Sequence, residues 1–138
     1  MSVKIEKSVY DKLAGTSGVT DIVGTSIFFI NAPQGTSFPF VTIQRVGTEP
    51  INHATGNGGT FNVTDQIDMY DKGSAGYEAV KNLADAVRDA LSGWTDTTAD
   101  PSVGMSLLVS ERDDIERPEA GRGRPIYRVS QDYSIWFA

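Results

Sequence analysis

The sequence contains no cysteine and only one histidine, His53. Without cysteine the chain can form neither a disulfide bond nor a thiolate metal site. With one imidazole it also lacks the usual ligands of a zinc or transition-metal centre. No apolar run approaches the roughly 20 residues that span a bilayer, and residues 1–7 lack the apolar core of a signal peptide. We therefore expect a soluble protein, made in a cytoplasm, with no membrane association.

Positive charge is also scarce: 12 basic residues face 18 acidic ones, for a net charge of −6. Proteins gain affinity for nucleic acids mainly by neutralising phosphates with basic side chains. The balance therefore argues against a dedicated nucleic-acid binder, although it is compatible with a protein past which DNA slides. The simplest interpretation is an acidic surface that keeps the protein soluble.

The 138 residues suit one domain spanning residues 1–138, and a domain of this size buries roughly 68–70% of its unfolded surface. Apolar residues fall on alternate positions in two segments, residues 61–70 and 126–138. A period of two predicts strands with one buried face and one solvated face.

The remaining patterns complete an α+β domain. We predict helices at residues 2–14 and 74–92 with a helical turn at 19–23, and further strands at 27–30, 40–46 and 105–109. Gly15 and Gly93 are placed to end the two helices in left-handed caps. This order predicts a mainly antiparallel sheet of four to five strands with helices packed on one face.

Two polar segments, residues 47–60 and 112–125, join strands and are far longer than ordinary hairpin loops. Long loops commonly carry function. Residues 111–128 hold five acidic residues and five arginines, and arginine favours bidentate pairing with carboxylates. Two interpretations stay open here: a solvated loop with weak local ion pairs, or a charged arm that docks on a neighbouring subunit. Our predicted interface residues in the two segments are Glu49, Asn52, His53, Asn57, Arg112, Arg117, Arg122 and Arg124.

No motif indicates catalysis. His53 lies in a glycine-rich loop, a poor position for the base of a Ser–His–Asp triad. The glycines of residues 56–59 lead into a strand, whereas a phosphate-binding loop opens a helix. Asp65 and Asp68 should face opposite sides of a strand and so cannot share one metal ion with Asp71 without a bulge. We predict no catalytic, cofactor-binding or metal site.

Several short segments recur in a known family in the same order and at similar spacing. They are residues 11–13 (DKL), 32–35 (APQG), 38–45 (FPFVTIQR), 66–70 (QIDMY), 83–91 (LADAVRDAL), 111–113 (ERD) and 132–137 (DYSIWF). With them, nearly the whole chain resembles the phage tail completion proteins, or tail terminators, of long-tailed phages. Residues 26–29 depart from the family, whose members often carry an arginine–tyrosine pattern there.

The resemblance implies a structural, non-enzymatic virion protein of the tail or neck, made in the host bacterial cytoplasm. It implies a homo-oligomeric ring of six subunits that caps the tail-tube protein and meets a head connector or stopper protein. DNA would pass through the hole without specific binding. Six copies at −6 each carry −36, a charge that would repel phosphates at close range.

Three alternatives remain beside the tail terminator. One is another neck or tail structural protein, either a head–tail stopper or a tail-tube subunit. A second is a small hydrolase that uses Asp65, Asp68 or Asp71. A third is a monomeric ligand-binding domain, which needs a mostly apolar pocket.

Overall fold

The fold is described from a computed structural model of the chain. The structure describes residues 4–53, 56–73, 75–99, 101–117 and 123–137, with the backbone alone for residues 4, 50–53 and 56–60. The elements are α1 (Lys4–Ala14), α2 (Ser17–Val23), β1 (Ile27–Phe29), β2 (Phe40–His53), β3 (Gly56–Lys72), α3 (Gly76–Leu91), β4 (Trp94–Asp96), β5 (Val103–Glu116) and β6 (Ile126–Phe137).

The described strands form one sheet of six strands in the order β1-β2-β3-β6-β5-β4. All neighbours pair antiparallel except β1 and β2, which run parallel. The α+β class and a mainly antiparallel sheet were predicted, but the expected number of four to five strands is wrong: the sheet has a sixth strand, and its β1–β2 pair is parallel. The sixth strand, β4, is only three residues long, too short to show an alternating pattern. Whether β1 runs parallel or antiparallel depends on the strand with which it pairs, and the residues of β1 do not specify that strand.

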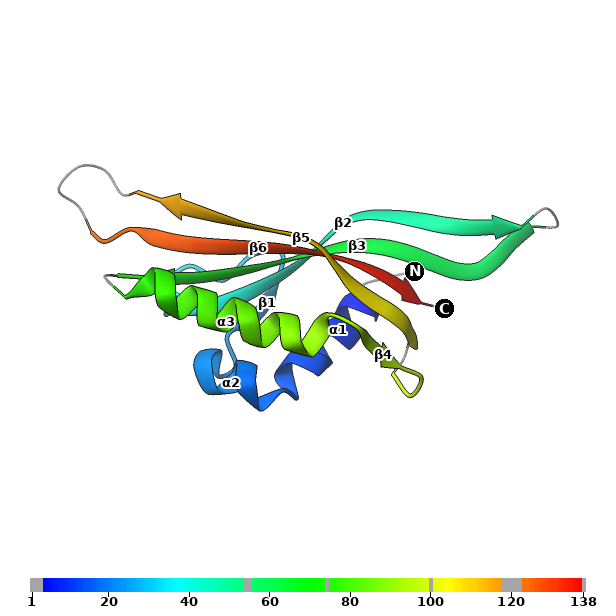
Figure 1. Ribbon diagram of the computed structural model, residues 1–138, viewed down its shortest axis with the longest axis horizontal. Helices are drawn as coiled ribbons and strands as arrows, with labels where there is room; N and C mark the ends of the chain where they lie inside the picture. The colour runs from blue at the N-terminus through cyan, green and yellow to red at the C-terminus, as the bar shows by residue number, and fades with distance from the viewer. Residues whose placement is uncertain (1–3, 54–55, 74, 100, 118–122, 138) are drawn as a thin grey trace.

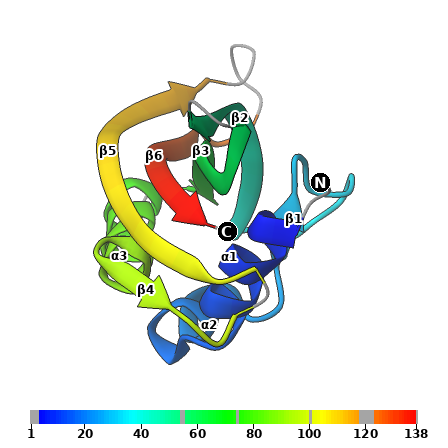
Figure 2. The same cartoon turned by 90° about the vertical axis from the view of Figure 1, so that its right-hand side faces the viewer.

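The helices cover one face of the sheet (Figure 1). α3 packs chiefly on β6 and β3, where its buried residues, including Leu83 and Val87, meet Ile67 of β3 and Ile135 of β6 in one core. Seen from its end, the sheet is strongly curled, and β5 bends around the side that carries α3 (Figure 2). The core thus lies between α3 and the two central strands.

Of the two glycines predicted to end a helix in a left-handed cap, one does so and the other does not. Gly93 has φ +78°, the left-handed conformation expected of a residue that ends α3. Gly15 does not adopt this conformation. Its N–H donates to Asp11 O at 2.9 Å, which continues the helical pattern, and α2 begins only two residues later, at Ser17.

Of the two segments predicted to be long loops, residues 47–60 are largely strand, whereas residues 112–125 are strand only as far as Glu116. β2 continues to His53 and β3 starts at Gly56, while β5 continues to Glu116 and β6 starts at Ile126. These extensions form two hairpin arms that project from opposite ends of the sheet, beyond the layer of helices (Figure 1). We call them the β2–β3 arm and the β5–β6 arm. Because both faces of an arm meet solvent, its residues need no polar–apolar alternation, and that is the signal the prediction used.

Truncation of the core should test this packing. Leu83 is fully buried on α3, so Leu83→Ala should lower the free energy of unfolding by about 2–5 kcal/mol, measured by urea denaturation. Ile22→Ala on α2 is the control, because Ile22 is 36% exposed and should lose far less. Equal losses in the two variants would contradict the assigned core.

Candidate assembly surface

The structure divides the predicted interface residues between the two arms. Glu49 is exposed on β2 opposite Asn62 of β3. Farther out in the same arm, the backbone of Asn52 pairs with that of Asn57, and His53 pairs with Gly56. Four of the predicted residues therefore lie together along the β2–β3 arm.

The predicted arginines belong to the other arm. Arg112 is exposed on β5, Arg117 follows the end of β5, and Arg124 precedes β6. Arg122 lies outside the described residues. The predicted set is therefore not one site: it occupies two arms at opposite ends of the molecule.

Some charged side chains of the β5–β6 hairpin form ion pairs with one another across the two strands. Arg112 donates to Asp132 at 3.0 Å, and Arg128 donates to Asp114 at 2.6 Å. Both cations belong to cross-strand contacts of the hairpin, and because these side chains are partly exposed the pairs contribute little stability. For Arg112 the contacts match the interpretation of local ion pairing.

Arg117 and Arg124 differ from those arginines. Both are exposed, and neither makes an ion pair with a described residue. The side chain of Arg124 passes Gly73, where an added Cβ would lie 3.6 Å from Arg124 Cδ. These two arginines thus flank the tip of the β5–β6 arm with their charges available to a partner.

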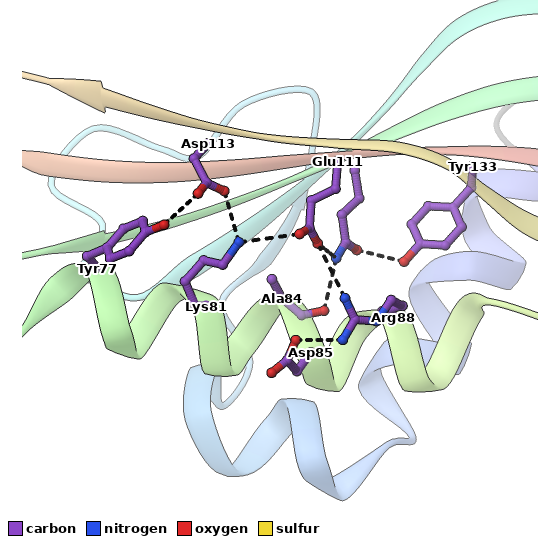
Figure 3. A network of polar contacts seen from close by, with 9 residues as sticks. Tyr77, Lys81, Ala84, Asp85, Arg88, Glu111, Asp113 and Tyr133 are labelled. Atoms are coloured by element: carbon purple, nitrogen blue, oxygen red, sulfur yellow. Dashed lines mark hydrogen bonds and ion pairs between the residues drawn. The ribbon is translucent and has the colours of Figure 1, made fainter.

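A polar network joins the base of the β5–β6 arm to α3 (Figure 3). Lys81 of α3 donates to Glu111 at 3.3 Å and to Asp113 at 3.1 Å, and the hydroxyl of Tyr77 donates to Asp113 at 2.7 Å. Arg88 donates to Asp85, its neighbour one turn away on α3, at 2.7 Å. The network fixes the arm at its base.

A buried amide completes this contact from the inside. Gln131 of β6 is fully buried. Its Nε2 donates to Ala84 O of α3 at 3.0 Å and to Glu111 of β5 at 2.7 Å, and its Oε1 accepts from the Tyr133 hydroxyl at 2.6 Å. One side chain therefore connects β6 to both α3 and β5.

Electrostatics favour the charged forms of Lys81 and Asp113 and the neutral form of Tyr133. The hydrogen bond to Asp113 raises the pKa of Lys81, and the hydrogen bond from Tyr77 lowers the pKa of Asp113. Burial raises the pKa of Tyr133, so its hydroxyl stays protonated and can donate. The arrangement can orient the arm rigidly.

The face of the sheet without helices is polar and internally hydrogen-bonded. Asn62 of β3 donates to Ser134 of β6 at 2.8 Å. Asp68 accepts from Gln66 at 3.0 Å and from the Ser130 hydroxyl. Within the described part of the chain, no group of three or more His, Cys, Asp or Glu side chains is arranged to hold a metal ion.

Comparison with known families explains this combination of arms and polar face. The family model described as Tail completion protein gp17 matches residues 7–138, nearly the whole chain. The chain belongs to this tail completion family. It is therefore a structural protein of the phage tail and a component of the virion.

A solved structure shares the fold of this tail completion protein. A chain in "Virion of native gene transfer agent (GTA) particle" superposes with a TM-score of 0.74 at 19% sequence identity, covering 94% of this chain and 90% of that chain. At this identity the likeness shows a common fold. No curated protein sequence matches the chain significantly. None of the described helices has the length and apolar character needed to span a membrane.

Sequence reasoning missed a buried acidic contact that ties α1 of the tail completion protein to the sheet. Asp65 of β3 lies between Arg45 of β2 and Tyr133 of β6 and is fully buried. Glu6 of α1 is also buried, and Arg45 donates to both of its oxygens, at 2.8 and 3.2 Å. The sequence held one signal of this burial: residue 65 falls on the same alternate positions of the strand as the buried residues 63 and 67.

Asp65 carries a proton at neutral pH. Among the described residues, neither of its carboxyl oxygens meets a hydrogen-bond donor. Burial and the neighbouring Glu6 raise its pKa to about 9, against the opposing effect of the Arg45 charge. Since a Glu6 carboxylate can only accept, a hydrogen bond between the two acids requires this proton.

The contact predicts how stability depends on pH. The pKa of Asp65 is higher in the folded protein than its ordinary value of 3.8, so the unfolded chain releases this proton first. Stability should therefore fall as pH rises from about 4 to about 9. Asp65→Asn keeps a neutral donor, so it should flatten this decline and exceed the wild type by about 1–3 kcal/mol at pH 8.

Urea denaturation at pH 5 and pH 8 would measure the difference. Asp11→Asn is the matched control, because Asp11 is exposed and forms its ion pair with the exposed Lys7. Identical pH profiles for the wild type and Asp65→Asn would contradict the proposed protonation of Asp65.

Proposed function

We propose that this tail completion protein assembles into a closed ring of six subunits that ends the tail tube and joins it to the head connector. The observation that carries the proposal is the pair of unlike arms at opposite ends of one sheet (Figure 1). A ring needs two different contact surfaces on every subunit, one for each neighbour. Family membership supports a role at the end of the tail, and the shared fold of a virion component supports assembly into a particle.

The partners follow from this role. The arms extend beyond the helix layer, so they can reach a neighbouring subunit, the tail-tube protein or the head connector. Arg117 and Arg124, which make no ion pair with a described residue, place positive charge on either side of the tip of the β5–β6 arm, and a carboxylate of a partner can bind each of them. The proposal makes these residues contacts between proteins rather than contacts with DNA.

The face without helices suits the wall of a DNA channel. Its polar side chains bond mainly to one another, and its arginines Arg112 and Arg128 are already paired with Asp132 and Asp114. Among the described residues of β3 and β6 on this face, Lys72 at the end of β3 is the one cation without an ion pair, so few groups can hold a phosphate. DNA would therefore pass with little specific binding.

A stopper or tail-tube subunit is the second candidate. Two unlike contact surfaces also produce an open filament when the rotation between subunits does not close. The distinction is the product of self-assembly, since a tube subunit polymerises without limit and a terminator stops at one ring.

Native mass spectrometry over a range of protein concentrations, with and without magnesium, should give a discrete species of six subunits and nothing larger. Open-ended polymers would favour the tail-tube subunit. A strict monomer would contradict ring formation in solution and direct the test to purified tail tubes, whose ends the protein should bind.

Removal of the arm-tip charges should impair assembly without unfolding the subunit. The variant Arg122→Ala/Arg124→Ala should shift the oligomer toward monomer in the same measurement, with an unchanged circular dichroism spectrum. Lys7→Ala/Lys12→Ala removes two positive charges from α1 and should assemble normally. Normal assembly of the arginine variant would exclude the tip from the interface.

A further inference from the structure

The two edges of the sheet are each only partly covered. In the described chain, β4 pairs with β5 only between residues 103 and 106, so residues 107–116 of β5 pair with β6 alone. At the other edge, β1 pairs with residues 41–43 of β2, and residues 44–53 pair with β3 alone. Open edges of this kind can accept another chain.

The covered part of one edge corresponds to the open part of the other. Successive pairings across β2, β3, β6 and β5 define rows, and β1 lies at the rows of residues 111–113 of β5. β4 lies at the rows of residues 48–50 of β2. If copies were placed side by side in one orientation, each added strand would meet the gap on its neighbour.

Exposed apolar side chains are concentrated at the same edges. Six of the eight large apolar side chains that are exposed in the described residues belong to them: Phe29, Ile30, Val46, Met105, Leu107 and Val109. Natural sheets protect open edges with charge rather than apolar groups. An apolar edge therefore indicates a surface that is covered in the assembled state.

Two of these exposed residues, Val46 and Val109, lie at the same height on the sheet. Both edge strands bulge beside the row that joins Arg45, Asp65, Tyr133 and Leu108: Val46 is the extra residue of β2, and Val109 is the extra residue of β5. Val46 is 59% exposed and Val109 is 64% exposed. Two bulges thus present one valine each, on opposite edges.

The β1–β2 edge also has a hollow that can receive a side chain. Its volume is about 190 Å³, and its lining includes Phe29, Ile30 and Ile43 beside the buried pair of Glu6 and Arg45. The β5 edge has a hollow of its own near its far end, lined by Tyr77, Ile115 and Tyr127. Beside the bulge, however, it carries the exposed side chains of Leu107 and Val109. At the level of the bulges, a hollow on one edge therefore corresponds to an exposed valine on the other.

Charge agrees with this match. Lys72 of β3 lies 5.7 Å from the centre of the Phe38 ring, beside the start of β2. Pairing through Ile126 places Glu116 of β5 in the row of Lys72, at the opposite edge. Neither Lys72 nor Glu116 makes an ion pair with a described residue. Each edge thus carries an unpaired charge of opposite sign at the same height.

We propose that the β5 edge of one copy docks on the β1–β2 edge of the next copy, with Val109 against the hollow of Phe29 and Ile30. Glu116 then lies near Lys72 of that neighbour. In copies of the same orientation, β5 runs antiparallel to the neighbouring β1, the more stable arrangement of strands. The contact is between unlike surfaces, so it repeats around a ring; this inference rests on the proposed ring function and specifies its interface.

Cysteine cross-linking tests the contact directly, because the chain has no cysteine of its own. Val46→Cys and Val109→Cys are prepared as separate chains, mixed, and treated with a short bismaleimide, which tolerates a wider range of geometry than a disulfide. A covalent dimer should form on mixing and exceed the product of either chain alone at least tenfold. One chain carrying both substitutions should give a ladder of cross-linked oligomers. Ile22→Cys on α2, mixed with either chain, is the control.

Native mass spectrometry of the same samples separates the possible failures. Rings without the mixed product would overturn the edge contact and leave the ring function intact. Monomers without the product would overturn both the contact and ring formation in solution. Equal cross-linking in Val109→Cys alone would also overturn the proposal, because it would indicate a two-fold contact between like edges.

A charged residue introduced at the β5 edge tests the contact independently, through its effect on assembly. Val109 is exposed, so Val109→Asp should leave the circular dichroism spectrum and thermal midpoint of the subunit unchanged. It should raise the protein concentration needed for half-assembly at least tenfold. Unchanged assembly of this variant would overturn the proposed contact.

Discussion

The packing of α3 on the paired strands β3 and β6 positions the rest of the molecule. These strands are joined from the row of Phe61 and Phe137 to the row of Lys72 and Ile126 without a shift in register. The buried side of α3 closes over this pair, so the hydrophobic effect fixes one face of the central strands as the interior. β2 and β5 are then added outward as the hairpin partners of β3 and β6, and their distal parts become the arms.

Two polar side chains interrupt this apolar layer and make the packing specific. Gln131 hydrogen-bonds to α3, β5 and Tyr133, so the helix can dock in only one register without leaving a buried amide unsatisfied. Asp65 performs a related role for α1 through Glu6 and Arg45, and protonation removes the cost of burying its charge. Buried polar groups of this kind favour one arrangement over others that an apolar core would tolerate.

The features that suit assembly lie outside the core of this structural member of the tail completion family. They are the two arms, the two partly covered edges of the sheet and the polar face. A small core of one helix layer and one sheet can hold such extensions because backbone pairing stabilises them strand by strand. Val46 and Val109 are exposed in the single chain and would be covered in the proposed contact between copies.

Periodicity by itself determined the core of this protein: the helices at 2–14 and 74–92 match α1 and α3 closely, and the alternation in 61–70 and 126–138 identifies the central strands. The order of short segments also determined the family, which the comparison confirms. The tertiary structure alone decided that residues 47–60 are largely strand and that β5 continues to Glu116, that β1 runs parallel to β2, and that Asp65 is buried beside Glu6. The physical reason is that side-chain pattern records burial against a core, whereas strand pairing in solvent and the choice of neighbour depend on backbone hydrogen bonds to residues distant in the chain.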